Sequence, residues 1–276
     1  MPEGDTIFKT ARLLHGGLAG QAVTRFESVF PALNRVDDEH PVAGRVIESV
    51  ISRAKHLLIV FTGDLILHTH MRMNGAWHLY ASGERWRRPA RDMRIVIEAG
   101  DQTAVGFTIP VAEFLTARTL ARHDQLRRLG PDLLDPQFDP ADARDRLRAR
   151  GPDAVGDALL NQQVLSGLGN VLKSEVLFVS RIDPFARIEC LSEEQLDRLI
   201  ATSRRLIGMN VVERPVWGRA FGRQTTNSLD PAARLWVYGR GGKPCRKCGT
   251  RIASRKTGLD ARVTYWCPQC QAPDAT

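Results

Sequence analysis

Long hydrophobic runs are missing from this chain of 276 residues, which narrows the classes of protein to which it can belong. The longest apolar run, Leu57–Phe61, is the length of a strand, whereas a membrane helix needs about 20 apolar residues. The first residues, MPEGD, lack the basic start and apolar core of a secretory signal. With 43% hydrophobic and 25% charged residues, a disordered or fibrous chain is excluded. We expect a cytoplasmic, monomeric globular protein with no membrane partner.

Lysine is scarce, and the positive charge is unevenly distributed. Six lysines stand beside 33 arginines, a ratio that suggests a GC-rich bacterial genome. Of the net charge of +8, residues 239–276 carry +6, residues 1–130 carry +3 and residues 131–238 carry −1. A basic patch near the C-terminal end attracts polyanions, with nucleic acid as the leading candidate. Charge alone equally allows a generic solubilising surface.

Cysteine is also rare, and four of the five cysteines follow one pattern. Cys245, Cys248, Cys267 and Cys270 read C-x2-C-x18-C-x2-C, the spacing with which two pairs of thiolates hold one tetrahedral zinc ion. Disulfides are the alternative, but cytosolic thiols stay reduced. We therefore predict one structural zinc as cofactor. Cys190 is interpreted as an ordinary, half-buried thiol.

The order of the periodic segments predicts an α+β fold that begins with a β-sandwich or barrel. A leading helix is expected over residues 6–15, with Asp5 as its N-cap and Gly16-Gly17 as its end. The arginine-rich stretch 83–94 is predicted to be a mobile loop. Seven short segments read as strands separated by turn residues: 22–30, 45–52, 56–61, 65–70, 76–80, 93–98 and 103–108.

Past residue 120 the pattern becomes helical. Asp139-Pro140 predicts the start of a helix that runs to Gly151, and a second helix is expected from Asp153 to Ser166-Gly167. Asn170 is predicted to cap a helix that ends near Ser180, and a capping box begins another at Ser192. The predicted domains are 1–121, a linker at 122–135, a helical domain at 136–236 and a zinc finger at 237–271.

The dipeptide Met1-Pro2 can supply a reactive N-terminal amine, because aminopeptidases remove Met before a small residue and Pro2 then begins the mature chain. A terminal proline is a secondary amine that can form an iminium with a sugar aldehyde carbon. The positive end of the following helix lowers the pKa of such an amine and enlarges its neutral, nucleophilic fraction. Glu3 lies beside it as a possible proton donor. Taken alone, the dipeptide favours the interpretation of Pro2 as an incidental start.

Residues 162–175, QQVLSGLGNVLKSE, read as a helix, a glycine-rich turn and a second helix that opens at Asn170. Free amides at that helix end, together with the Asn side chain, can hold a phosphate. A capped helical hairpin without a ligand explains the same pattern, and the stretch alone does not decide between them.

Together these features resemble the formamidopyrimidine-DNA glycosylase and endonuclease VIII family over nearly the whole chain. The N-terminal MPEG is similar to the family's start, and residues 52–58, SRAKHLL, to its catalytic lysine motif. Residues 167–170, GLGN, resemble its helix–two-turn–helix. Residues 237–240, VYGR, the four cysteines and Arg262 resemble its zinc finger. Four such motifs in the right order are a specific signal.

The resemblance implies a bifunctional base-excision enzyme that flips a damaged nucleotide out of DNA. Pro2 would attack the sugar and expel the base, with Glu3 as general acid and Lys55, on a strand, assisting proton transfer. The Schiff base would then undergo β- and δ-elimination. Asn170 and Arg262 would bind the phosphates that flank the lesion, and Met73 would fill the vacated stack. Without the family, Lys55 reads as a surface lysine, Met73 as core, and Arg262 as one of eight basic residues in its module.

The chain departs from the family pattern at several positions. Asp5-Thr6 stands where bacterial members commonly have Pro-Glu, so that glutamate is missing. Residues 106–110, GFTIP, lack the Arg-Arg-Phe-Gly stretch of the purine-specific branch, while residues 75–77, GAW, resemble the endonuclease VIII branch. Arg72 and Asn74 differ from the common wedge residues of that branch.

Oxidised pyrimidines in duplex or single-stranded DNA are therefore the expected substrate. Two alternatives stay open: excision of oxidised purines such as 8-oxoguanine, and a non-catalytic zinc-dependent DNA-binding protein. Retained Pro2, Glu3 and Lys55 argue against the second alternative.

Overall fold

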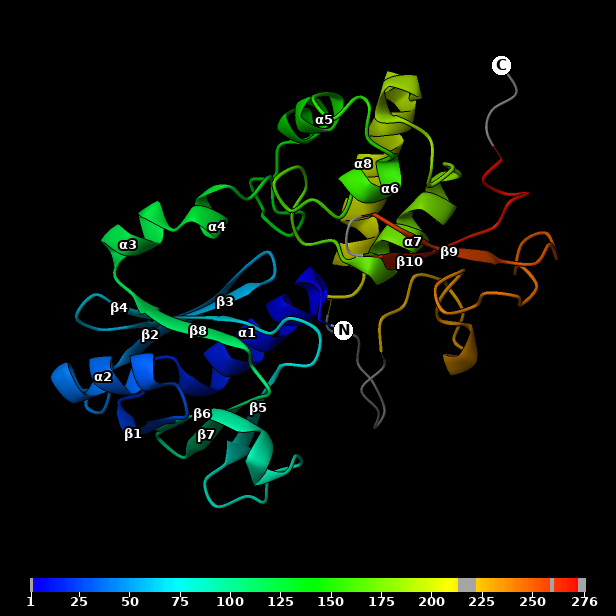
Figure 1. Ribbon diagram of the computed structural model, residues 1–276. Helices are drawn as coiled ribbons and strands as arrows, with labels where there is room; N and C mark the ends of the chain where they lie inside the picture. Colours follow the sequence, from blue (N-terminus) through cyan, green and yellow to red (C-terminus); the bar gives the residue numbers. More distant parts are fainter. Residues whose placement is uncertain (1, 213–221, 259–260, 273–276) are drawn as a thin grey trace. The chain divides into compact units, whose positions relative to one another are not determined.

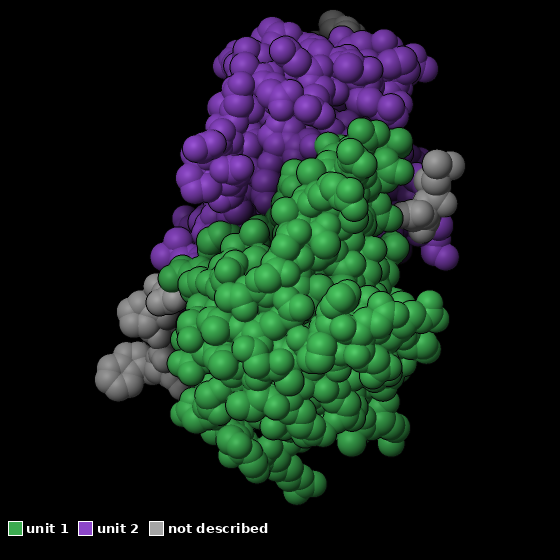
Figure 2. Space-filling view, turned by 90° about the vertical axis from the view of Figure 1, so that its left-hand side faces the viewer, with its two compact units in different colours: residues 1–128 green, residues 129–276 purple. Residues whose placement is uncertain are grey.

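The computed structural model describes residues 2–212, 222–258 and 261–272. It divides into two compact units, residues 1–128 and residues 129–276, which are described separately (Figure 2). The boundary falls inside the stretch predicted as a linker, and the helical region and the zinc module share the second unit. Among the described residues, no helix combines the length and the apolarity that crossing a membrane requires.

The first unit contains two four-stranded antiparallel sheets and a leading helix, α1 (Figure 1). The first sheet has the order β1-β6-β7-β5, with β1 at Val23–Ser28, β5 at Ala76–Ala81, β6 at Met93–Ala99 and β7 at Gln102–Phe107. The second has the order β2-β3-β4-β8, with β2 at Ile47–Arg53, β3 at His56–Phe61, β4 at Leu65–His70 and β8 at Val111–Leu115. All seven predicted strands are present, which confirms the predicted N-terminal β-sandwich.

Helix α1, Gly4–Leu18, is longer than its sequence pattern predicted. Glu3 and not Asp5 is the N-cap, and the two glycines do not end the helix. The helix crosses closely over β5, and this crossing favours glycine at position 17 because a Cβ there would lie 2.5 Å from Leu79 Cδ2. The buried face of α1 packs into one apolar core with residues of both sheets. Tertiary packing therefore overrides the helix-ending tendency of glycine.

Five elements of the first unit were not predicted. Helix α2, Pro31–Glu39, has proline in its first turn and buries only Leu33. Its sparse apolar pattern explains why periodicity does not detect it. Strand β8 lay in a stretch without clear alternation, and two short helices follow it: α3, Ala117–Arg122, and α4, Asp124–Arg127. The 3-10 turn η1, Ala90–Asp92, lies in the β5–β6 connection.

The second unit is helical around a separate apolar core, and the zinc module closes it. The caps of α5 and α8 are confirmed: the Asp139 side chain accepts from the Ala141 amide, and Ser192 forms a capping box with Gln195. The elements are α5 at Pro140–Arg148, α6 at Val155–Ala158, α7 at Asn170–Ser180, η2 at Ile188–Cys190, α8 at Glu193–Gly208, η3 at Pro231–Ala233, β9 at Ala253–Thr257 and β10 at Arg262–Trp266.

Two predictions for this unit were wrong. The helix expected from Asp153 to Ser166-Gly167 is only the four residues of α6, and successive turns replace its second half. The amides of Val155 and Gly156 bond instead to the carbonyls of Ala186 and Pro184, which holds this segment against a distant part of the chain. Cys190, expected to be half-buried, is exposed at the end of η2.

Candidate functional site

The N-terminal residues place two carboxyl groups at the start of α1. Pro2 is half-buried and directly precedes Glu3, the N-cap of α1, whose carbonyl accepts the amides of Thr6 and Ile7. The Glu3 and Asp5 side chains are buried, with 0% and 2% exposure. Asp5 Oδ1 accepts from the Thr6 amide at 2.7 Å. A buried carboxylate therefore stands in the same turn as Thr6, where the family's second glutamate is missing.

Lys55 lies in the tight turn between β2 and β3, and not on a strand as predicted. Arg53 pairs with His56 across the hairpin, and Ala54 takes the positive φ of 55° that the two-residue turn requires. The half-buried Lys55 is close enough to His70 for its charge to act on that ring. Burial, followed by the charges of Arg72 and Lys55, lowers the pKa of His70 to about 4.

A row of polar side chains follows the second sheet beside this turn. His56 Nδ1 lies 2.8 Å from His68 Nε2, His68 Nδ1 lies 2.9 Å from Glu113 Oε1, and His123 Nε2 lies 3.0 Å from the same oxygen. Strand register explains the row, because His56 faces His70 across β3–β4 and His68 faces Glu113 across β4–β8. The rings of His56 and His70 are 4.8 Å apart.

The hydrogen bonds assign the protons in this row. The bonds to His68 and His123 outweigh burial and lower the pKa of Glu113, so the carboxylate is ionised and only accepts. His68 therefore donates from Nδ1 and accepts at Nε2 from His56 Nδ1. His123 Nδ1 accepts the Leu126 amide at 3.4 Å, which leaves the proton on Nε2. Burial, with the charges of neighbouring histidines, lowers the pKa of His56 to about 2, so this ring is neutral near pH 7.

The same row contains donor atoms of the kinds that bind metals. The ligating atoms of His68, Glu113 and His123 lie within 4.8 Å of one another. Metal binding through His123 Nε2 would shift its proton to Nδ1, the nitrogen that accepts the Leu126 amide. The hydrogen-bond pattern therefore favours a proton-ordered chain over a metal site.

Met73 lies in the turn between β4 and β5 with 49% of its surface exposed, whereas its neighbour Met71 is buried in the core. Arg72 has a positive φ of 50°. Gly75 allows a close return of the chain, since a Cβ there would lie 2.5 Å from the Met71 carbonyl oxygen. The turn thus presents Met73 outward, so the core interpretation of this residue is wrong.

Asn170 and the strand that carries Arg262 are joined in the second unit. The N-cap of α7 is Gly169, and the Asn170 side chain makes no cap bond, so its predicted capping role is wrong. Asn170 Nδ2 donates to the Val263 carbonyl at 2.9 Å, one residue after Arg262. Its buried Oδ1 has no hydrogen-bond partner among the described residues. A second bond lies alongside, from the fully buried Lys173 Nζ to Thr264 Oγ1 at 2.7 Å.

Glu175 fastens α7 to the chain segment that leads into the zinc module. Its carboxylate is fully buried and accepts the amides of Trp236, Val237 and Tyr238, each at 2.8 Å. The Thr225 hydroxyl donates to it as well. Burial raises the pKa of Glu175, and these bonds oppose that shift. Such a carboxylate acts as a structural anchor for residues 236–238.

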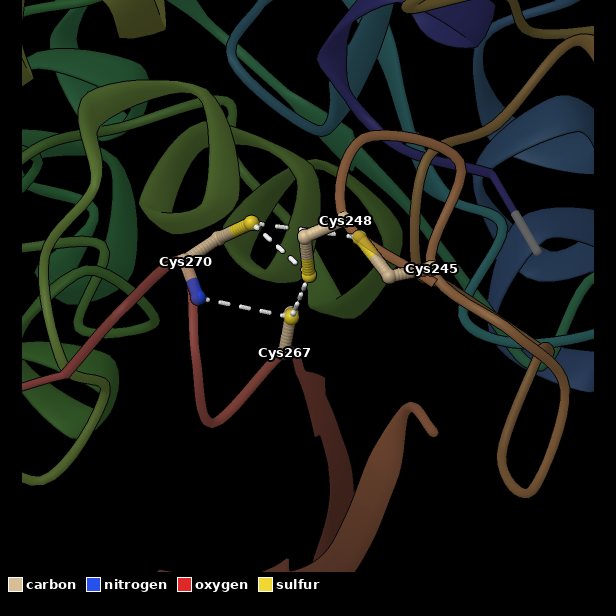
Figure 3. Close-up of side chains that lie close together, drawn as sticks. All are labelled: Cys245, Cys248, Cys267 and Cys270. Carbon is tan, nitrogen blue, oxygen red and sulfur yellow. Dashed lines mark hydrogen bonds between the residues drawn. The ribbon is translucent and has the colours of Figure 1, made fainter. Parts of the chain in front are cut away.

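The four predicted zinc ligands converge (Figure 3). The sulfur atoms of Cys248 and Cys267 are 3.4 Å apart, those of Cys248 and Cys270 3.5 Å, and those of Cys245 and Cys270 3.9 Å. A tetrahedral zinc with Zn–S bonds of about 2.3 Å separates its sulfurs by roughly 3.8 Å, so the cluster fits the ion. Hydrogen bonds from Thr250 lower the pKa of Cys248 to about 6, while burial raises that of Cys267 and Cys270.

Sequence reasoning missed the His56–His68–Glu113–His123 row and the anchor at Glu175. The signal was faint. Histidines at alternate positions, 68 and 70, share one strand face, but Glu113 comes from a strand far away in sequence and His123 lies outside the strands. Of the predicted residues, the structure brings together the four cysteines, and it joins Asn170 to the strand of Arg262. Pro2, Glu3, Lys55 and Met73 belong to the first unit.

Comparison with known proteins identifies three regions. Residues 1–110 match the formamidopyrimidine-DNA glycosylase N-terminal domain, residues 129–214 the H2TH domain of the same enzymes, and residues 242–273 the zinc finger found in FPG and IleRS. The fold resembles that of Lactococcus lactis Fpg in complex with abasic-site DNA. That likeness has a TM-score of 0.82 at 23% identity and covers 99% of this chain and 100% of the other.

Relatives similar in sequence span essentially the whole chain. A probable endonuclease 8 2 of Streptomyces coelicolor is 42% identical, covering 100% of this chain and 95% of the relative. The DNA-(apurinic or apyrimidinic site) lyase Nei2 of Mycolicibacterium smegmatis is 39% identical, with 98% and 99% covered. Endonuclease 8 of Escherichia coli is 33% identical, with 98% and 100% covered. With its four-cysteine finger and sheet-then-helix order, this chain belongs to the formamidopyrimidine-DNA glycosylase and endonuclease VIII family of base-excision DNA glycosylases, within the endonuclease VIII-like bacterial branch.

Proposed function

We propose that this protein excises oxidised pyrimidines from DNA and then cuts the backbone at the abasic site, with the Pro2 amine as nucleophile. The observation that carries the proposal is the position of Pro2, immediately before the N-terminus of α1 and next to the buried Glu3 carboxyl group. The positive end of the helix favours the neutral amine. The Glu3 carboxyl group follows this amine directly in the chain and can serve as the general acid.

In the proposed reaction the Pro2 nitrogen uses its lone pair to bond to C1′ of the flipped nucleotide. Glu3 protonates the sugar ring oxygen, the glycosidic bond breaks, and the base leaves with that bond's electron pair. The Pro2 nitrogen then loses its proton, and its lone pair forms the C=N bond as the C1′–O4′ bond breaks, with that bond's electrons going to the protonated ring oxygen. An iminium then joins Pro2 to the open sugar. Loss of a proton from C2′ expels the 3′ phosphate, and loss of a proton from C4′ expels the 5′ phosphate. Lys55, in the β2–β3 turn, assists these proton transfers.

The second unit would hold the DNA backbone. Asn170 and Arg262 would bind the phosphates that flank the lesion, and the bond from Asn170 to Val263 supports their joint action because it fixes β10 against α7. The zinc ion, held by the four cysteines, would keep the module that carries β10 folded and would take no part in the chemistry. Met73 would enter the vacated stack, which its outward position permits.

The preference for pyrimidines rests on the stretch after β7. Phe107 and Ile109 are buried in the first unit, with 0% and 1% exposure, and no arginine follows them before β8. The side chains with which the purine-specific branch fills the void opposite the lesion therefore have no counterpart here. Thymine glycol should be excised from a duplex faster than 8-oxoguanine from a matched duplex. The reverse order would favour the purine alternative, and no excision of either would favour a non-catalytic DNA-binding protein.

The Pro2 mechanism is tested by trapping with borohydride. Reduction of the iminium should give a stable protein–DNA adduct, and digestion should locate it on the N-terminal peptide with Met1 removed. A variant that retains a residue before Pro2 should lose both base excision and lyase activity, because its amine becomes an amide. Glu3→Gln should slow base release much more than cleavage of a preformed abasic site. An adduct on Lys55, or full activity with a blocked N-terminus, would refute this mechanism.

A further inference from the structure

Residues 83–94, which comprise most of the β5–β6 connection and the first two residues of β6, account for the whole net charge of the first unit. Residues 83–94 hold five arginines and two carboxylates, a net charge of +3. The rest of residues 1–128 holds twelve basic and twelve acidic side chains, so it is neutral overall. A local excess of this kind attracts polyanions more effectively than the same charge dispersed over a surface. We name residues 83–94 the arginine arm.

The charge of the arm is not neutralised within the described part of the protein. Its arginines form no ion pair there, whereas Arg25 on β1 binds Glu27 and Glu98. Arg85 and Arg91 are exposed. The Glu84 carboxylate accepts the backbone amide of Ala81, at the end of β5, at 3.1 Å.

Side-chain contacts hold the arm against the first sheet. Trp86 packs edge-on against Phe107, with ring centroids 5.7 Å apart. The Arg87 amide donates to the Tyr80 hydroxyl at 3.1 Å, and the Arg87 guanidinium lies over the Tyr80 ring. The arm is therefore anchored by Trp86 and Arg87, while Arg85 and Arg91 are exposed. Anchoring of this kind reduces the conformational entropy lost when the arm binds a ligand.

The arm lies beside the turn that carries Met73. Arg88 Nη1 donates to the Asn74 carbonyl oxygen at 3.3 Å, which links the arm to the residue after Met73. Burial, followed by the charges of Arg87 and Arg88, lowers the pKa of His78 on the adjacent strand. Positive charge therefore acts on the same region of the unit in which the proposed function places the void-filling side chain.

From this geometry we propose that the arginine arm is a second phosphate-binding surface, which contacts the DNA backbone near the Met73 turn through Arg85, Arg88 and Arg91. Arginine suits this role because its planar guanidinium matches phosphate oxygens in a bidentate manner. The inference rests on the proposed function, since it takes duplex DNA as the partner. The contacts are to phosphates and carry no base specificity, so the arm strengthens binding to damaged and undamaged duplex alike.

The test compares two double variants of the full chain with equal loss of charge. Arg85→Ala/Arg91→Ala removes two exposed arginines of the arm and leaves its anchors Trp86 and Arg87 intact. The matched control, Arg25→Ala/Arg35→Ala, removes two arginines of the same unit that have carboxylates nearby, Glu27 and Glu98 for Arg25 and Asp37 to Glu39 for Arg35. Fluorescence anisotropy measures Kd for a labelled undamaged duplex over a range of salt concentrations.

Each lost phosphate contact lowers the slope of log K against log salt by about 0.9. The arm variant should lose about 1.8 from the slope and bind more weakly at low salt, whereas the control variant should keep the wild-type slope. Equal slopes in all three proteins, or equal losses in both variants, would overturn the inference. Excision by the wild-type protein, measured in parallel, tests the proposed function separately: an active enzyme with an unchanged arm-variant slope refutes only the arm.

Discussion

Acid should destabilise the first unit through His56, and replacing this residue with asparagine isolates the effect. The Asn side-chain amide lies about where Nδ1 of the imidazole lies, so His56→Asn keeps the donor to His68 and removes the titrating group. His56 is 6% exposed, and burial holds its pKa at about 2 in the folded protein against an ordinary value of 6.5. Between these two pKa values, His56 therefore binds a proton in the unfolded chain and stays unprotonated in the folded protein.

The sign and the size follow from the two pKa values. Because the folded pKa is the lower one, the stabilisation is fully present above pH 6.5 and is lost as the pH falls toward about 2. Each pH unit in this window is worth about 1.4 kcal/mol, so between pH 7 and pH 5 His56 alone costs roughly 2 kcal/mol. That corresponds to about a 30-fold increase in the population of opened states.

Hydrogen exchange read by mass spectrometry, corrected for the intrinsic pH dependence of exchange, measures this loss in peptides from β3 and β4. The wild-type protein should lose at least about 2 kcal/mol of protection between pH 7 and pH 5, and His56→Asn should lose about 2 kcal/mol less. His40→Asn, at an exposed position after α2, should behave as the wild-type protein does. The reasoning is refuted if His56→Asn and the wild-type protein lose the same protection, or if neither is sensitive to acid.

Three further perturbations test separate parts of the structure. Cys248→Ser should abolish zinc binding, measured by metal analysis, and weaken DNA binding while the first unit keeps its thermal transition; a zinc-free wild-type protein would contradict this. Glu175→Ala leaves three buried or half-buried amides without their acceptor and should cost at least about 3 kcal/mol in urea unfolding, so a loss below about 1 kcal/mol would remove its anchoring role. Met73→Ala should slow base excision and spare cleavage of a preformed abasic site. Its stability should be nearly unchanged because the side chain is half exposed, whereas Met71→Ala should cost about 2–5 kcal/mol of folding stability. Equal slowing on both DNA substrates would count against insertion of Met73 into the stack.

Features encoded by neighbouring residues were predictable from the sequence. The Asp139-Pro140 helix start and the capping box at Ser192 each depend on groups within a few residues of one another, and each pair of cysteines is separated by two residues. All three features are present. The seven strands were recognisable because alternation survives where one face of a sheet is buried. The N-terminal Pro2-Glu3 pair and the lysine motif were also visible locally, although Lys55 lies in a turn and not on a strand.

Tertiary structure alone decided the features that depend on pairing between distant segments. Strand register brings His56, His68 and Glu113 into one row across 57 residues of chain, and hydrogen bonds between strands carry no local sequence signature. Glu175 finds its donors at residues 225–238 for the same reason. The helix expected from Asp153 shortens because Val155 and Gly156 bond to a remote segment, and α1 continues through Gly17 because packing on Leu79 outweighs the helix propensity of glycine. Local propensities are worth less than about 1 kcal/mol per residue, so long-range contacts decide where they compete.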